Sequence, residues 1–421
     1  MSMRKLKEVY EILVAASYAH AKWEYETAQV ILSDKKRLLI LGLMLLPILI
    51  VPVVFAVDLP SVLGGKKAYA PAFSTTQMLG ASLFIGLCAG LITGCIGAGG
   101  GFIITPALMS AGVRGILAVG TDMFHIFAKA IMGTAVHRKL GNVSVALAIA
   151  FVIGSITGVT CGGTINRAVY YANPVLSDVL ISLVYVFLLG FLGTFAMRDY
   201  LRLRKRVAAF DGANPAEVVA TTKLAMKLQS IYLPPMISFD HDLYSGGRQI
   251  SAWFVIGCGF IVGFVAAIMG VGGGFLTFPM YVYMLGVSSF TTVGTDIFQI
   301  IITAGYASIG QYAIYGFVFY TLAMGLLIGS LIGIQVGALA TKVVKGLYIR
   351  GFYATVILAG FLNRLFALPS KLASAGILSL DRSVGDALNL IGIVVFFVIV
   401  IVFAGWVFLK FVGNLKMLRE V

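Results

Sequence analysis

The chain alternates long apolar runs with short polar segments. The first apolar run, 38–57, follows a polar segment, 1–37, in which apolar residues recur at helical spacing. About 20 apolar residues cross a bilayer as a helix, and the long polar lead argues against a cleaved signal peptide. We therefore predict a cytoplasmic amphipathic segment over 1–37 and a retained anchor span over 38–57.

Nine further apolar runs follow, and one long polar segment, 198–250, divides them into two groups. The runs cover residues 78–111, 115–136, 143–165, 175–197, 251–286, 289–311, 315–341, 350–367 and 388–412. This pattern predicts an all-α polytopic membrane protein. The polar segment opens with a basic cluster over 198–206, which favours a cytoplasmic loop.

Three motifs occur twice in the same order, which indicates an internal duplication. GxGGGF begins at Gly97 and Gly270, VGTD begins at Val119 and Val293, and GSxxG begins at Gly154 and Gly329. Secondary transporters are commonly built from two such halves. We therefore assign a first repeat to 78–197, a second repeat to 251–367 and a separate C-terminal span to 388–412.

Basic residues predict that the two repeats face opposite sides of the membrane. In the first repeat the loop near residues 137–139 is basic, whereas its counterpart in the second repeat, near 311–316, is uncharged. The next loop shows the opposite difference, because its copy in the second repeat, 341–350, is the more basic one. Basic loops mark the cytoplasmic side, so we expect inverted repeats. Inversion requires 78–111 and 251–286 to be hairpins broken at glycines, and it places both termini and the 198–250 loop in the cytoplasm.

The triple glycines are candidate substrate-binding residues. Each glycine costs a helix interior about 1 kcal/mol relative to alanine, and a broken helix persists in a membrane only against protein or a water-filled cavity. A helix that begins after such a break presents free N–H groups to an anion. The predicted residues are Gly99, Gly100, Gly101, Gly272, Gly273 and Gly274. The alternative is that these small residues only allow close helix packing.

Ionisable residues supply the second set of candidates. Asp122, His125 and Lys129 follow i, i+3, i+7 spacing and so share one helix face. Such groups are costly in a membrane and mark substrate or proton pathways. We predict substrate binding by Lys129, Thr121 and Thr295, and coupling to a proton or cation by Asp122, Asp296, His125 and Gln299. The alternative is a structural Asp122–Lys129 pair that fixes helix packing.

Composition supports the membrane assignment and excludes a soluble protein. Hydrophobic residues make up 60% of the chain and charged residues only 11%, against about 25% charged residues in soluble domains. The net charge of +14 is explained by orientation, so no nucleic-acid partner is expected. The cysteines form no CxxC pair and the chain has no Walker A motif. We expect no cofactor, no metal centre and no enzymatic activity; a short run, 240–242, is a weak metal candidate.

The paired motifs resemble those of the TauE/SafE sulfite exporter family, also called the toluenesulfonate uptake permease family, over about residues 78–367. The resemblance implies a four-to-five-span duplicated anion transporter of a prokaryotic cytoplasmic (inner) membrane, with sulfite or an organosulfonate as substrate. The chain departs from the family pattern at Asp122 and Asp296, where many members carry a small hydroxyl residue. We expect a secondary transporter that exports a small sulfur-containing anion, with proton coupling. Its expected partners are the lipid bilayer and a second copy of the chain in a homodimer.

Two functions from other classes also fit the sequence. Cys88, Cys95 and Cys161 could serve a membrane thiol-redox enzyme. The polar segments 1–37 and 198–250 could instead dock a non-transporting subunit onto a respiratory or redox complex.

Overall fold

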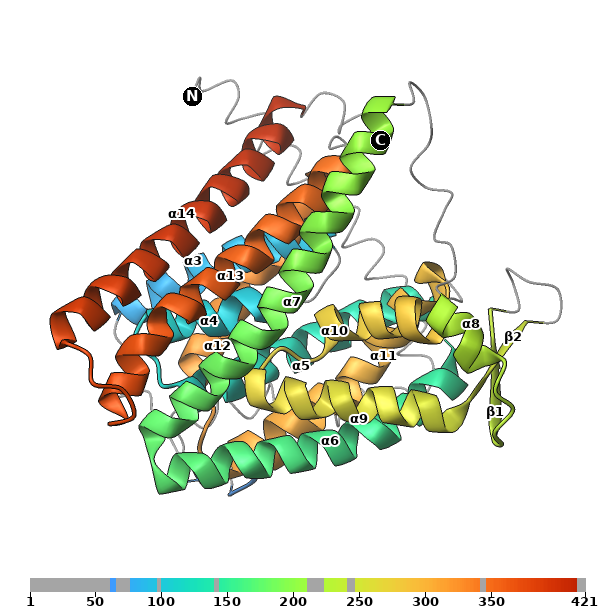
Figure 1. The fold of residues 1–421 in the computed structure, drawn as a ribbon, viewed down its shortest axis with the longest axis horizontal. Coiled ribbons are helices and arrows are strands. Elements are labelled where there is room, and N and C mark those ends of the chain that lie inside the picture. The colour runs from blue at the N-terminus through green and yellow to red at the C-terminus, as the bar shows by residue number, and fades with distance from the viewer. Residues whose placement is uncertain are drawn as a thin grey trace, which may run out of the picture.

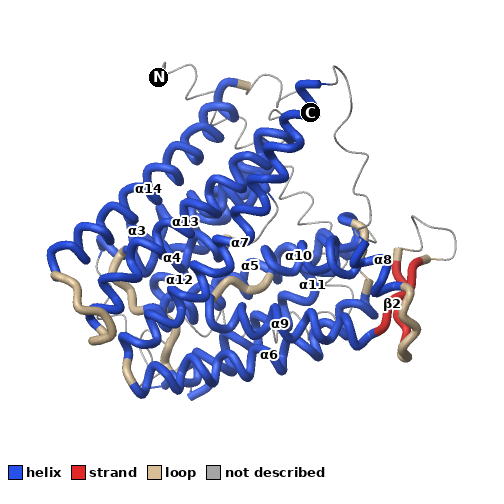
Figure 2. The backbone as a smooth tube through the Cα atoms, viewed as in Figure 1, coloured by secondary structure: helices blue, strands red, loops and turns tan. Residues whose placement is uncertain are grey.

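The computed structural model describes residues 61–65, 76–96, 100–139, 144–209, 223–240, 247–340 and 346–414. The predicted amphipathic segment 1–37 and anchor 38–57 lie outside these residues. The described chain folds almost entirely into helices (Figure 2). Eight of the described helices are long and apolar enough to cross a membrane, so the protein is an all-α polytopic membrane protein, as the hydropathy pattern predicted.

The helices follow the order that the duplicated motifs suggest. The first set comprises α3 (Thr76–Ile96), α4 (Gly101–Ser110), α5 (Gly115–Lys139), α6 (Val145–Ala172) and α7 (Pro174–Ala209). The second set comprises α9 (Ala252–Met269), α10 (Gly274–Pro279) with the π-helical turn η5 (Met280–Leu285), α11 (Ser289–Tyr306) with η6 (Ala307–Tyr312) and η7 (Ala313–Tyr315), α12 (Tyr320–Ala340) and α13 (Gly346–Ser374). A short turn, η2 (Ser61–Leu63), precedes the first set, and α14 (Arg382–Gly413) follows the second.

Glycines interrupt the two apolar runs that were predicted to be hairpins. The run 78–111 divides into α3 and α4, and the run 251–286 divides into α9 and α10–η5. In the second break Gly270, Gly272 and Gly273 have φ angles of 78°, 63° and 89°. Only glycine adopts this left-handed backbone without a Cβ clash, so the break depends on these residues.

Two glycine-lined helix pairs form the centre of the fold. α3 packs against α12, and α6 packs against α9 (Figure 1). A Cβ on Gly333 of α12 would lie 2.3 Å from the Leu87 carbonyl oxygen, and one on Gly158 of α6 would lie 2.1 Å from the Phe260 carbonyl oxygen. Small residues at every fourth position allow backbones to approach this closely. Each pair therefore joins a helix of one repeat to a helix of the other.

The close contacts also fix the relative directions of these helices. In α3 and α12 the contacting residues advance together, from Gly86 with Leu326 to Gly90 with Ser330, so the two helices are parallel. The α6–α9 pair is parallel by the same criterion, with contacts of 154 to 256 and 158 to 260. α7 and α13 are antiparallel, since residue 190 contacts 361 whereas residue 200 contacts 351.

The helices that carry the VGTD motif complete this set of directions. α5 and α11 are antiparallel, because residue 120 contacts 312 whereas residue 127 contacts 305. α5 runs parallel to α12, because residue 121 bonds to 319 and residue 125 bonds to 330. α6 runs parallel to α11, because residue 144 bonds to 295 and residue 155 bonds to 303. α3 and α5 therefore point the same way, so the short helix α4 between them must return. The same holds for α10–η5 between α9 and α11. These directions are compatible with the inverted arrangement, which stays a prediction.

The polar segment 198–250 begins later than its composition suggested. α7 continues to Ala209, so the basic cluster lies on a helix, as expected of good helix formers such as Arg, Lys and Leu. The rest contains α8 (Lys223–Gln229) and an antiparallel pair, β1 (Met236–Phe239) and β2 (Arg248–Ser251). Gln229 Nε2 donates to the Leu285 carbonyl at 2.7 Å and Arg248 Nη1 to the Gly286 carbonyl at 2.8 Å. The insert is therefore fixed to the connection between η5 and α11.

Two neighbouring glycines of α9 provide a matched test of the close helix packing. A Cβ on Gly259 would lie 2.2 Å from the Phe151 carbonyl oxygen, whereas one on Gly257 would meet nothing within 4 Å. We expect Gly259→Ala to destabilise the protein by about 1–3 kcal/mol through overpacking. Gly257→Ala should leave stability unchanged or raise it, since alanine is the better helix former. Thermal unfolding in detergent measures both, and equal melting temperatures for the two variants would contradict the packing.

Candidate functional site

The two glycine breaks meet at the centre of the helix assembly. A Cβ on Gly101 would lie 2.7 Å from Val271 Cα, and one on Gly272 would lie 2.6 Å from Ile126 Cγ2 of α5. Phe102 and Phe275, which follow the two breaks, have ring centroids 5.9 Å apart. The structure therefore places the two breaks in contact at Gly101 and Val271. Position 99 lies outside the described residues.

Tyr185 of α7 links the two breaks. Its side chain is fully buried, and its hydroxyl donates to the Met269 carbonyl oxygen at 2.7 Å, with the Gly101 carbonyl oxygen 3.4 Å away. One hydroxyl thus reaches the end of α9 and the start of α4. Sequence reasoning could not find this role, because a tyrosine within an apolar run is usually a core residue.

A line of four buried polar side chains begins beside the first break. Thr105 Oγ1 of α4 donates to Asp122 Oδ2 at 2.9 Å, and His125 Nε2 lies 2.9 Å from Ser330 Oγ of α12. We call Thr105, Asp122, His125 and Ser330 the first polar line. It combines all three motif segments, because α4 follows GxGGGF, Asp122 belongs to VGTD, and Ser330 belongs to the GSxxG of the other repeat.

The centre of the first polar line lacks a close hydrogen bond. Asp122 Oδ1 and His125 Nδ1 lie 3.5 Å apart, and neither buried atom has a hydrogen-bond partner. A buried polar group left without a partner costs about 1–3 kcal/mol. The pair can therefore gain free energy from a proton or from a small change in geometry.

A second polar line occupies the corresponding helices of the other repeat. Gln299 Nε2 donates to Asp296 Oδ1 at 2.8 Å, Thr303 Oγ1 donates to Gln299 Oε1 at 2.9 Å, and the hydroxyls of Thr303 and Ser155 lie 2.7 Å apart. Ser155 belongs to the GSxxG of the first repeat. Each polar line thus ends on a serine supplied by the opposite repeat, which sequence spacing alone could not indicate.

The remaining predicted residues have different surroundings. Lys129 lies one turn beyond His125 on the same helix face, is partly buried, and has no hydrogen-bond partner among the described residues. Thr121 Oγ1 accepts from the Phe319 backbone N–H and Thr295 Oγ1 from the Ser144 backbone N–H, both at 2.9 Å. These two hydroxyls bind the start of α12 and of α6, so the structure does not bring them into the polar lines. Of the other glycines, Gly100 and Gly273 directly precede α4 and α10, and Gly274 is the first residue of α10.

The weak metal candidate in the polar insert has a structural explanation. Asp240 Oδ2 accepts from the Ser288 backbone N–H at 2.9 Å and Oδ1 accepts from the Ser288 hydroxyl at 2.7 Å. Asp240 therefore satisfies the start of α11. Residues 241 and 242 lie outside the described part of the chain, and the residues inside it contain no group of three metal-binding side chains.

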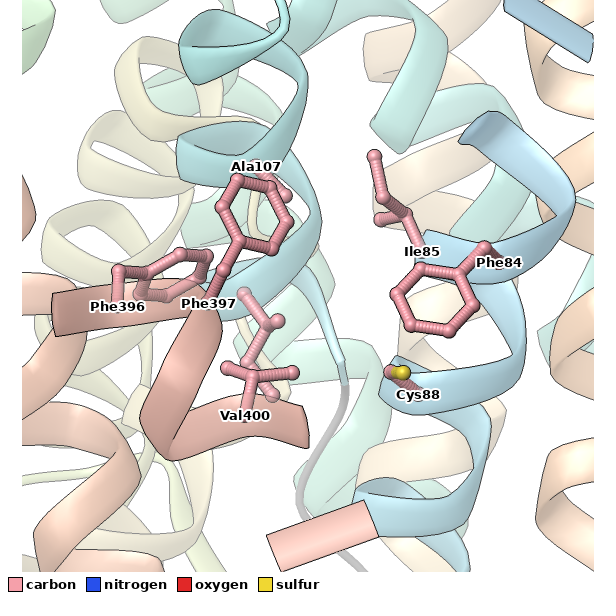
Figure 3. Close-up of a pocket in the computed structure, with 8 residues that line it drawn as sticks. Phe84, Ile85, Cys88, Ala107, Phe396, Phe397 and Val400 are labelled. Atoms are coloured by element: carbon pink, nitrogen blue, oxygen red, sulfur yellow. The ribbon is translucent and has the colours of Figure 1, made fainter. Parts of the chain in front are cut away.

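α14 covers the outer side of the first hairpin. Figure 3 shows Phe396, Phe397 and Val400 of α14 on one side of α4, and Phe84 and Cys88 of α3 on the other. The gap between them is lined by apolar side chains and has no space for a water molecule. A separate hollow of about 250 Å³ lies where α3 begins and α4 ends. Its lining residues include Gln77, Ser82, Leu108, Ala111 and Val113.

The fold and the two polar lines define a class of protein, a polytopic helical membrane protein with glycine-broken hairpins of the kind that secondary transporters use. The family model described as "Sulfite exporter TauE/SafE" matches residues 82–364. The chain belongs to the TauE/SafE family. α14 lies beyond the matched residues.

Curated relatives agree with this assignment. The chain is 23% identical over 264 residues to "Probable membrane transporter protein YjnA" of Bacillus subtilis, which covers 61% of this chain and 87% of the relative. It is 24% identical over 265 residues to YunE of the same organism, covering 60% and 85%, and 26% identical over 216 residues to MJ0441 of Methanocaldococcus jannaschii, covering 49% and 63%. Both carry the same description. No solved structure matches the chain. The family and these relatives identify it as a membrane transporter.

The link made by Tyr185 can be tested without disturbing the core. Tyr185→Phe keeps the buried ring and removes the hydrogen bond to the Met269 carbonyl, so we expect a loss of about 0.5–1.5 kcal/mol in stability and faster amide hydrogen exchange in both breaks. Tyr281→Phe is the matched control, because the equally buried hydroxyl of Tyr281 lies 3.5 Å from the Leu147 carbonyl oxygen. Exchange measured by mass spectrometry that rises equally in both variants, or in neither, would contradict the link.

Proposed function

We propose that this protein is a secondary transporter of two inverted repeats that exports a small sulfur-containing anion, sulfite or an organosulfonate, across the cytoplasmic membrane with coupling to protons. The observation that carries the proposal is the meeting of two glycine breaks beside two buried polar lines. The description of the matching family as a sulfite exporter supports the substrate class.

The first break provides the chemistry that an oxyanion needs. α4 begins at the break, and its residues from Gly101 to Met109 are buried. Its first N–H groups therefore face protein rather than lipid. Such groups, at the positive end of the helix dipole, favour an anion. Lys129 adds a cation within the same helix face as Asp122 and His125. A sulfite or sulfonate group has only acceptor oxygens, so it fits a site made of donors.

The two polar lines suit proton coupling. In the first, a proton on Asp122 or His125 would stand between Oδ1 and Nδ1, which now face each other across 3.5 Å. In the second, Asp296 accepts from a neutral amide and has no cationic partner among the described residues. Proton binding to a buried carboxylate removes a charge that is costly in the membrane. We propose that protonation of Asp122 and Asp296 alternates with anion binding during transport.

The helix directions support alternating access. α3, α5 and α12 point one way and α6, α9 and α11 the other, so each hairpin enters from its own side of the membrane. The basic end of α7 and the basic segment 341–350 support a cytoplasmic location for the α8–β1–β2 insert. On this assignment the first hairpin opens to the outside and the second to the cytoplasm, which is the arrangement an alternating site requires.

Proton coupling predicts a specific defect in two variants. In proteoliposomes loaded with labelled sulfite, we expect a pH gradient to accelerate flux by the wild type. Asp122→Asn and Asp296→Asn should lower gradient-driven flux by about tenfold or more, because an amide cannot exchange the proton. Sulfite exchange without a gradient should persist in both variants. Asp386→Asn is the control, since Asp386 is exposed on α14, outside the residues that the family model matches.

Two results would overturn separate parts of this proposal. Gradient dependence that survives in both variants would assign the aspartates a structural role. A wild-type protein that carries neither sulfite nor organosulfonates would exclude the substrate class.

A further inference from the structure

Arg364 of α13 is a buried cation that forms no ion pair with a carboxylate among the described residues. It is 1% exposed and is the largest of the fully buried side chains. Its Nε donates to Asn363 Oδ1 at 2.8 Å, and its Nη2 donates to Ser110 Oγ at 2.9 Å. Its Nη1 is buried and has no hydrogen-bond partner in the described structure. Up to two N–H donors of the guanidinium are therefore unused.

The surrounding groups compensate this charge only in part. The Pro106 carbonyl oxygen, near the negative end of α4, lies 3.3 Å from Nη2. The nearby carboxylate of Asp178 already accepts from Lys371 Nζ at 2.7 Å and from the Gly115 backbone N–H at 2.8 Å. A buried charge without full compensation costs several kcal/mol, so a bound anion would stabilise this arrangement.

A second buried arginine shows what a fully engaged guanidinium looks like in the same protein. Arg167 Nη1 donates to the backbone and side-chain oxygens of Gln311 at 2.7 and 2.6 Å, and its guanidinium lies 4.1 Å from the centre of the Tyr315 ring. Within the described residues no buried nitrogen of Arg167 lacks a partner, in contrast to Nη1 of Arg364.

Arg364 is also close to the site through α4. Thr105 bonds to Asp122, while the carbonyl of the next residue, Pro106, accepts from Arg364. The cation and the first polar line therefore contact the same turn of α4. The hollow of about 250 Å³ reaches the end of that helix at Leu108 and Ala111.

We propose that Arg364 binds the oxygens of the transported sulfite or sulfonate through its free Nη1 edge, with Asn363 and Ser110 orienting the guanidinium. This inference rests on the proposed function and names its substrate-binding cation. Both free N–H donors belong to Nη1, and the bonds made by Nε and Nη2 hold them in a fixed direction, whereas a lysine ammonium offers only a point charge on a flexible stem. Arg364 thus recognises the oxyanion group, while Lys129 contributes charge alone.

The test separates substrate binding from a structural role. Arg364→Lys keeps the charge and loses the fixed direction of the Nη1 donors, so we expect the KM for sulfite to rise about tenfold with little change in maximal flux. We expect sulfite to raise the melting temperature of the detergent-purified wild type relative to chloride at equal ionic strength. Arg364→Gln should abolish both this rise and the flux. The melting temperature of Arg364→Gln without sulfite should match or exceed that of the wild type, because an uncompensated buried charge is removed. Arg167→Gln, the matched control, should melt earlier and keep the wild-type KM.

Each contrary result has a distinct meaning. A wild-type KM in Arg364→Lys, together with a lowered melting temperature of sulfite-free Arg364→Gln, would overturn the proposal and make Arg364 a structural partner of α4. A wild-type protein that neither transports nor is stabilised by sulfite or organosulfonates would overturn the proposed function, and this inference with it.

Discussion

Inside a membrane, a helix can be interrupted only where other protein groups cover the exposed backbone. This constraint organises the centre of the present structure, because two interrupted helices cover each other. The first break packs on the backbone of the second at Gly101 and Val271, and Tyr185 bonds to the end of α9 beside them. The two hairpins therefore contact each other at the point where each helix is interrupted.

The close helix pairs make that meeting possible. α3 against α12 and α6 against α9 bring their axes together along glycines, and each pair takes one helix from each repeat. Glycine thus has two separate uses in this chain. At Gly270, Gly272 and Gly273 it permits a left-handed backbone, whereas in the helix pairs it leaves room for a neighbouring carbonyl.

The polar side chains of the two repeats also combine with each other. Ser330 completes the first polar line and Ser155 the second, and each comes from the opposite repeat. Thr121 likewise binds the start of α12, and Thr295 binds the start of α6. Hydrogen bonds thus connect the polar side chains of each half directly to helices of the other half.

Sequence reasoning reached the features that depend on local pattern. Hydropathy located the apolar runs, the triple glycines located the breaks, and helical spacing placed Asp122 and His125 on one face. Contacts between repeats were beyond it, because periodicity within a helix does not say which other helix it faces. For this reason the serines that complete the two polar lines were not predicted. Thr121 and Thr295 were predicted as substrate ligands, whereas in the structure their hydroxyls accept hydrogen bonds from backbone N–H groups.

Arg364 was missed for a related reason. The apolar run that contains it was predicted to end at 367, where an arginine near the boundary of a span usually reaches the membrane surface. The helix instead continues to Ser374, and the side chain is fully buried against α4. The basic cluster 198–206 shows the same effect, because composition marked a loop where a good helix-forming sequence extends α7.

The central claim is that the two meeting breaks form the anion site. A cryo-EM map of the protein in lipid nanodiscs, saturated with sulfite, tests it most directly. We expect the two breaks in contact and density for the anion within about 3 Å of donors at the first break. Separated breaks, or sulfite bound only at a surface away from α4 and α5, would contradict it.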